Sequence, residues 1–205
     1  PETRNARIRA HLTRLEDKLG STQQAISSLR DLLSPLTDAA DTIALRDMAP
    51  TSAAVIAEVV DAEDSATWLQ GALGELYATL SAQGILADGP AGGIFTDEMF
   101  THHRGRATIF VPCIDPVRPV GRVISQVIPA AELAVITHVG APDSVDRAYG
   151  TLATYVARHA LAVDGPIREY YLVGQHDTED TSQWRTEIGW PIFHTGPPAR
   201  TPTKV

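Results

Sequence analysis

Two short segments near the end of the chain carry acidic and aromatic side chains at the spacing of a β-strand. Glu169 precedes Tyr171 by two positions, and Arg185 precedes Glu187 by two positions. Side chains two positions apart on a strand point to the same face. A carboxylate that is desolvated beside aromatic rings attracts an organic cation strongly, and it can also serve as a general base. These side chains are therefore candidates for binding a cation or for moving a proton.

The elements that position these residues occur twice in the chain. The stretch 74–90 begins Gly-Glu-Leu-Tyr and ends Asp-Gly-Pro, and the stretch 150–166 begins Gly-Thr-Leu-Ala and ends with the same Asp-Gly-Pro at the same spacing. A duplication of this size predicts two similar units related by a pseudo-twofold axis. We expect a cleft between the two units, because ligands commonly bind between packed units.

The two copies differ where function is expected. Alignment of the second-copy proline Pro191 with its counterpart places Glu187 opposite Thr108, and a similar alignment places Glu169 opposite Gly93 and Tyr171 opposite Phe95. The fold does not require an acid at a position where the other copy has none. The candidate ligand-binding residues are Glu187, Tyr171, Glu169, Phe95, Phe110, Thr108 and Arg185.

Structural alternatives exist for each candidate. Glu187 can be an exposed strand residue that pairs with Arg185, and Glu169 can be an edge residue that faces water. The aromatic candidates, Tyr171 among them, can equally belong to the core, because large aromatic side chains are usually well buried.

Hydrophobic periodicity predicts the order β-β-α-β-β in each copy, and hence an α+β fold. In both copies the first two strands read as a hairpin. The predicted first repeat spans 41–113, with strands at 42–46, 53–60, 91–96 and 107–111, a helix from Asp64 or Ser65 to about Gly84, and a polar turn at 97–103. The predicted second repeat spans 121–193, with strands at 122–128, 133–139, 168–173 and 184–190 and a helix that follows Asp143 or Ser144.

The first 35 residues predict a long coiled-coil helix. Residues from Ile8 to Leu33 alternate in steps of four and three and are apolar except at Thr22, where the seam is interrupted. Charged residues flank the seam, and Pro35 ends the pattern. Such a stripe must be buried, and we expect a homodimer that pairs through residues 4–34; packing on the chain's own globular domain is the alternative. Residues 194–205 are rich in proline and predict a disordered tail.

Composition excludes several classes of function. The formal net charge of −8 argues against nucleic-acid binding by this chain alone, because phosphate binding needs a basic surface. The single cysteine, Cys113, allows no internal disulfide, which fits a reducing cytoplasm, and no apolar run is long enough for a membrane helix. We expect no metal and no cofactor. His102 and His103 match no zinc spacing, and the chain has no glycine-rich phosphate loop.

Three motifs carry a resemblance to a known family. His138-Val139-Gly140-Ala141-Pro142 precedes the second helix, Glu169-Tyr170-Tyr171 lies in a strand, and Thr186-Glu187-Ile188-Gly189-Trp190-Pro191-Ile192 closes the domain. Together with the duplication, they resemble the GyrI-like effector-binding domain. With the heptad helix ahead of it, the chain resembles the effector half of a MerR-type transcription regulator of the multidrug-sensing, BmrR-like kind. In one departure, Ala141-Pro142 stands where the family often has Pro-Tyr, so the tyrosine is absent.

The resemblance implies a cytoplasmic, ligand-sensing and dimerising module for small hydrophobic cations, with Glu187 as the acid that pairs with the ligand. Promoter DNA would be bound by a helix-turn-helix domain expected upstream of Pro1, and RNA polymerase would be a partner of the full-length regulator. The resemblance also implies an alternative, a hydrolase of small strained electrophiles in which Glu187 is the general base and Tyr171 assists. An inhibitor of DNA gyrase is a third possibility. The long helix favours the sensor, because stand-alone members of the family do not need one.

Overall fold

A computed structural model describes residues 43–141 and 144–193 of the chain. The predicted coiled-coil helix at 1–35 and the predicted disordered tail at 194–205 lie outside these residues. The strands are β1 (Ala44–Met48), β2 (Thr51–Asp61), β3 (Ala91–Phe95), β4 (Arg104–Pro112), β5 (Ile124–Ile128), β6 (Ala131–Val139), β7 (Ile167–Val173) and β8 (Arg185–Pro191). The helices are η1 (Ala62–Asp64), α2 (Ser65–Gln83), α3 (Asp97–Thr101), α4 (Asp146–Arg158) and η3 (Thr181–Gln183).

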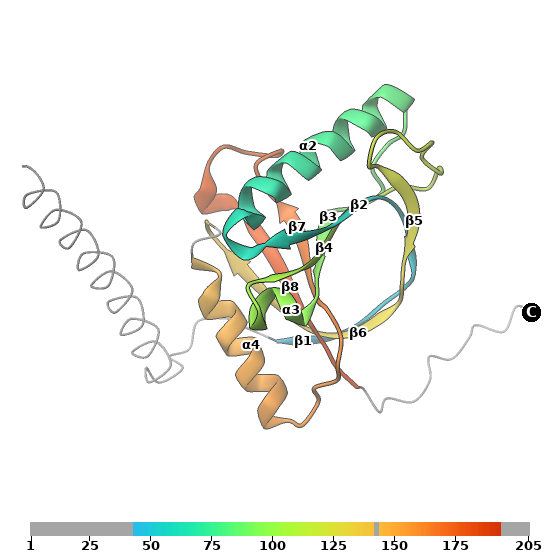
Figure 1. Cartoon of the computed structure of the whole chain (residues 1–205). Helices are drawn as coiled ribbons and strands as arrows, with labels where there is room; N and C mark the ends of the chain where they lie inside the picture. The colour runs from blue at the N-terminus through green and yellow to red at the C-terminus, as the bar shows by residue number, and fades with distance from the viewer. Residues whose placement is uncertain (1–42, 142–143, 194–205) are drawn as a thin grey trace, which may run out of the picture. The chain divides into compact units, whose positions relative to one another are not determined.

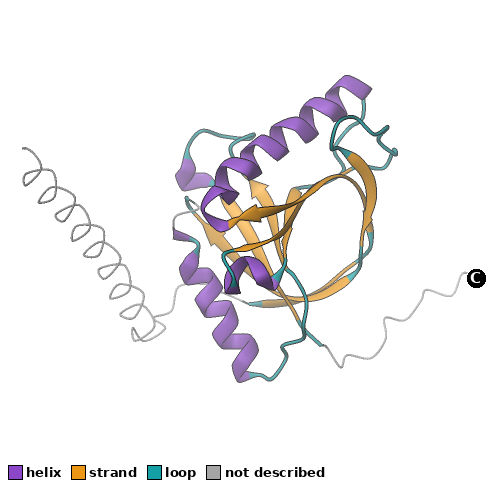
Figure 2. Ribbon diagram, viewed as in Figure 1, coloured by secondary structure: helices purple, strands orange, loops and turns teal. Residues whose placement is uncertain are grey.

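All eight strands form one antiparallel sheet in the order β1-β6-β8-β7-β3-β4-β2-β5. The sheet curls into a half-barrel, with α2 and α4 on its outside (Figure 1). Figure 2 shows the same arrangement as orange strands around an interior and purple helices outside it. The predicted mixture of sheet and helix is therefore confirmed.

The duplication is visible in the strand order, because β1-β6-β8-β7 on one side mirrors β5-β2-β4-β3 on the other. The halves join where β3 pairs with β7. In this pair Gly93 lies opposite Glu169, Ala91 opposite Tyr171, and Phe95 opposite Ile167. The pairing is symmetric about Gly93 and Glu169, so the pseudo-twofold axis passes between these two residues.

The two predicted hairpins are wrong. β1 pairs with β6 of the other repeat, and β5 pairs with β2, so each repeat gives its first strand to its twin. The links between the strands, Ala49-Pro50 and Pro129-Ala130, each contain a proline. A two-residue type I′ turn needs positive φ at both positions, and proline holds φ near −65°. The exchange of strands carries the chain across the molecule and extends the sheet into the half-barrel.

The helices are close to their predicted ranges. Gly84, with a φ of 68°, ends α2 in the left-handed conformation that favours glycine. α2 buries Leu76 and Leu80 against the first repeat's strands, and α4 buries Leu152 and Val156 against the second's. The predicted polar turn at 97–103 instead contains α3, whose first turn carries two acidic residues at the favourable helix N-terminus.

The sheet has two buried faces, which separate the candidate residues. The helix face packs on α2 and α4. The inner face lines the half-barrel. Its buried core residues are Ala53, Val55, Phe110, Ile128, Leu133, Val135 and Tyr170. Because side chains alternate along a strand, neighbouring residues of β7 lie on opposite faces.

Candidate functional site

A carboxylate held by two phenols lies at the pseudo-twofold axis. The hydroxyl of Tyr149, from α4, donates a hydrogen bond to Glu169 Oε1 at 2.6 Å. The hydroxyl of Tyr171 donates to Glu169 Oε2 at 2.9 Å. We call these three residues the acid–tyrosine cluster. It lies on the helix face, because Tyr171 packs against the α2 core and Tyr149 belongs to α4.

Gly93 makes room for this cluster. A Cβ atom on Gly93 would lie 2.7 Å from ring atoms of Phe95 and 2.8 Å from the hydroxyl oxygen of Tyr171. These distances are shorter than van der Waals contact, so the two rings converge over the bare backbone of β3. The aromatic pair predicted from the duplication, Phe95 and Tyr171, is therefore brought together beside Glu169.

Burial dominates the electrostatics of the cluster. It raises the pKa of Glu169 above its ordinary value, although the bonds from Tyr149 and Tyr171 and the nearby His138 lower it. Burial, followed by the charge of Glu169, also raises the pKa of both tyrosines, so they remain hydrogen-bond donors at neutral pH. Within the described residues no Lys or Arg forms an ion pair with Glu169. When ionised, this carboxylate therefore has no Lys or Arg partner among the described residues.

A hollow of about 410 Å³ adjoins the cluster. Tyr171 lines it and so connects it to Glu169. Tyr77 stacks on His176 at the hollow, with 4.5 Å between the ring centroids. The volume falls in the range of pockets that take small organic molecules. The other lining residues are Ala87, Gly89, Pro90, Ala91, Leu172 and Asp177.

The remaining predicted residues lie elsewhere. Glu187 is on the inner face, because its neighbour Ile188 packs on the α4 core as predicted. Phe110 is also on the inner face, and Thr108, two positions before it on β4, lies on the same side. Arg185 is exposed. The seven predicted residues thus do not line a single cleft.

Glu187 has a partner that the sequence did not indicate. It is only 8% exposed, and Arg46 Nη1 donates a hydrogen bond to its Oε2 at 2.7 Å. The alternative in which Glu187 is exposed and pairs with Arg185 is therefore wrong. The predicted catalytic combination of Glu187 and Tyr171 is also not assembled, because the two side chains lie on opposite faces of the sheet.

Sequence reasoning missed two members of the sites. The first is Tyr149, which is absent from the sequence-based candidates and whose hydroxyl reaches Glu169 from α4. The second is Arg168, a charged residue of β7 that is nevertheless buried. Its position two residues before Tyr170 predicts a face shared with that ring, but only the sheet register shows which face this is.

Two other kinds of site lack support among the described residues. No three His, Cys, Asp or Glu side chains in ranges 43–141 and 144–193 lie close enough together to hold a metal ion. None of the helices that the structure describes combines the length and apolar character needed to cross a membrane.

The sequence model of the GyrI-like small molecule binding domain matches residues 41–192. The chain belongs to the GyrI-like family. No curated protein sequence matches it significantly.

Solved structures share the fold of this GyrI-like chain. EcmrR in its complex with DNA, within EcmrR-RPo, is 21% identical with a TM-score of 0.66, over 87% of this chain and 70% of that one. The EcmrR C-terminal domain is 22% identical with a TM-score of 0.65, over 74% and 97%. A hydrolase encoded by lin2189 from Listeria innocua is 13% identical with a TM-score of 0.54, over 75% and 92%. At these identities the likeness establishes the fold alone.

Proposed function

We propose that the GyrI-like domain binds small apolar cations at the acid–tyrosine cluster and the adjoining hollow. The observation that carries this proposal is Glu169: a carboxylate in low-polarity surroundings, contacted by phenols and without a cationic partner among the described residues. A bound cation would neutralise the negative charge of Glu169 in a site where solvent screening is weak. The faces of Tyr171 and Phe95 would bind its apolar groups.

We further propose that cation binding serves a MerR-type transcription regulator, of which this chain is the sensing and dimerising part. Membership of the GyrI-like family and the fold shared with EcmrR, a protein solved in a complex with DNA, support this role. Promoter DNA would be bound by a domain outside this chain, and the regulator would act in the cytoplasm with RNA polymerase.

Dimerisation gives a direct test of the regulator. We expect the chain to sediment as a dimer, because the heptad seam has to be buried. Replacing Leu15 and Leu19 with lysine should convert it to a monomer, since two charges per chain would enter the seam. The matched change Lys18→Ala alters a flanking position and should leave the dimer intact. A dimer that survives both lysine substitutions would contradict pairing through residues 4–34.

The pH dependence of binding tests the role of Glu169. Tetraphenylphosphonium has no titratable group, so its affinity should follow ionisation of the carboxylate. We expect the affinity to rise with pH above 4.5, the ordinary pKa of a glutamate, because the pKa of Glu169 is raised by burial. Fluorescence titration at a series of pH values measures this. An affinity that falls or stays flat over this range would contradict the proposal.

The same raised pKa fixes the sign of a stability effect. Between pH 4.5 and the raised pKa the folded protein binds more protons than the unfolded chain. The contribution of Glu169 to the free energy of unfolding therefore declines as pH rises through this window. This decline and the gain in cation affinity should occur together.

A hydrolase is the second candidate function, and the lin2189 hydrolase that shares the fold is one reason to keep it. In the present geometry the general base would be Glu169 and the assisting phenol Tyr171, because these two are hydrogen-bonded at 2.9 Å. Incubation with cyclopropanoid substrates tests this candidate. Turnover that is lost in Glu169→Gln would support the hydrolase.

A further inference from the structure

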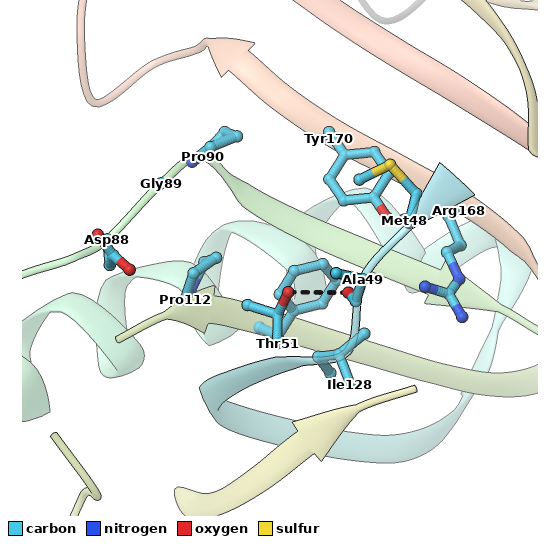
Figure 3. A pocket seen from close by; sticks show the side chains of 11 residues that line it. Met48, Ala49, Thr51, Asp88, Gly89, Pro90, Pro112, Ile128, Arg168 and Tyr170 are labelled. Atoms are coloured by element: carbon cyan, nitrogen blue, oxygen red, sulfur yellow. Dashed lines mark hydrogen bonds between the residues drawn. The ribbon is translucent and has the colours of Figure 1, made fainter. Parts of the chain in front are cut away.

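We propose that the inner face holds a second binding site, for a small apolar carboxylate that pairs with Arg168. This site is separate from the acid–tyrosine cluster, because Arg168 and Tyr170 point to the inner face of β7 whereas Glu169 and Tyr171 point to the helix face. A cavity of about 170 Å³ opens on the inner face, and Arg168 and Tyr170 line it (Figure 3).

The first reason is an uncompensated buried charge. Arg168 is 4% exposed. Within the described residues its guanidinium forms no hydrogen bond and no ion pair. No side-chain nitrogen of the described residues is sealed from solvent without a partner, so the guanidinium must reach accessible space. The cavity that it lines supplies that space. Arginine keeps its charge in proteins, and a buried charge is costly unless it is paired.

The register of the sheet explains the position of Arg168. It pairs with Ile94 on β3 and with Gly189 on β8. Gly189 has no side chain, and a Cβ atom there would lie 2.7 Å from Leu133 Cδ1. The long side chain of Arg168 therefore lies on the inner face beside Gly189, which has no side chain to occupy the same space.

The neighbouring charged side chains do not balance the positive charge of Arg168. Glu187 lies on the same face, but it already accepts a hydrogen bond from Arg46 at 2.7 Å. Asp88 is exposed and borders the cavity, and it forms no ion pair in the described part of the chain. Arg46 and Glu187 neutralise each other, so Arg168 keeps the unpaired charge on the buried inner face, while Asp88 stays exposed to solvent at the border of the cavity. An anion that enters the cavity would balance the charge of Arg168.

The walls of the cavity define the chemical class of the anion. Phe110 and Tyr170 meet edge to face, with 6.1 Å between ring centroids, and Met48 and Ile128 add apolar surface. A volume of about 170 Å³ suits a single aromatic ring or a short alkyl chain. A carboxylate matches the fork of a guanidinium with two parallel hydrogen bonds. Inorganic phosphate fits poorly, because these walls cannot replace its hydration.

The test uses benzoate and the full chain, with methionine methyl groups labelled for NMR. The chain has two methionines. Met48 lines the inner cavity, whereas Met99 packs in a separate cluster with Val60 and Ala107. Benzoate should shift the methyl resonance of Met48 and leave that of Met99 in place. Benzyl alcohol and benzylammonium, which match its shape without the negative charge, should bind much more weakly.

Substitution of the arginine gives the decisive comparison. Arg168→Met keeps the length of the side chain and removes its charge, and it should weaken benzoate binding at least about tenfold. The control is Arg158→Met, at an exposed position in the last turn of α4, which should leave the affinity unchanged. Equal benzoate affinity in Arg168→Met, or a shift of Met99 in place of Met48, would overturn the proposal.

The proposal remains testable if Arg168→Met does not fold. In the unmodified chain, benzyl alcohol that binds as tightly as benzoate would overturn it. The absence of any Met48 shift at about 10 mM benzoate, which would nearly saturate a site with a Kd of about 1 mM, would also overturn it. These results are independent of the cation site. Failure of tetraphenylphosphonium to bind would contradict the proposed function and leave the carboxylate site standing.

Discussion

Glu169→Gln should remove most of the protein's affinity for tetraphenylphosphonium. The substitution keeps the size of the side chain and removes the only charge in the acid–tyrosine cluster. Loss of a partly desolvated charged contact weakens binding by about 1–3 kcal/mol. Fluorescence or calorimetric titration at neutral pH measures this loss. The Gln variant should also lose the rise in affinity with pH that the raised pKa of Glu169 predicts.

Glu187→Gln is the matched control for this experiment. Glu187 is also a buried strand acid, but it lies on the inner face and pairs with Arg46. Its replacement should leave cation affinity close to that of the parent chain. The opposite result, with affinity lost in Glu187→Gln and kept in Glu169→Gln, would place the cation on the inner face and refute the proposed site.

Gly92→Ala should destabilise the fold by about 1–3 kcal/mol, the scale of overpacking in a well-packed core. The new Cβ atom would lie 2.5 Å from the ring of Phe110 and 2.6 Å from the carbonyl oxygen of Glu169. The ring can shift slightly. The carbonyl belongs to the neighbouring strand, so it cannot move away without disturbing the β3–β7 ladder that joins the two halves.

Gly74→Ala provides the matched control, and its effect should have the opposite sign. Gly74 lies inside α2, and a Cβ atom there would meet nothing within 4 Å. Alanine in a helix interior should therefore stabilise the protein by about 0.5–1 kcal/mol. Urea denaturation of both variants gives the two free energies of unfolding. If both changes stabilised the protein, the close approach of β3 and β7 at Gly92 would be wrong.

Local features of the fold could be predicted because local chemistry determines them. The predicted helix from Asp64 or Ser65 to about Gly84 agrees with α2 in its start and in its end. The repeat in the sequence also predicted correctly that Gly93 and Glu169 occupy corresponding positions. The two residues also lie opposite each other in the sheet, because the pseudo-twofold axis passes between them.

The hairpins could not be predicted, because strand partners depend on contacts far apart in the sequence. β1 and β2 follow each other in the chain, yet they pair with different strands. Period-two alternation marks a strand without naming its neighbour. The proline in each link disfavours a tight two-residue turn. Only the observed strand pairing shows that no hairpin forms at these links.

The candidate site divides in the same way. The sequence by itself determined which residue types were available: a carboxylate and tyrosines on one strand, and a second acid on the last strand. Only the tertiary structure decided which face each side chain joins and which partner it finds. Glu187 finds Arg46 through the exchanged strand β1, and Glu169 finds Tyr149 through the packing of α4. The physical reason is that the energy of a buried charge depends on its neighbours in space, and the fold selects those neighbours.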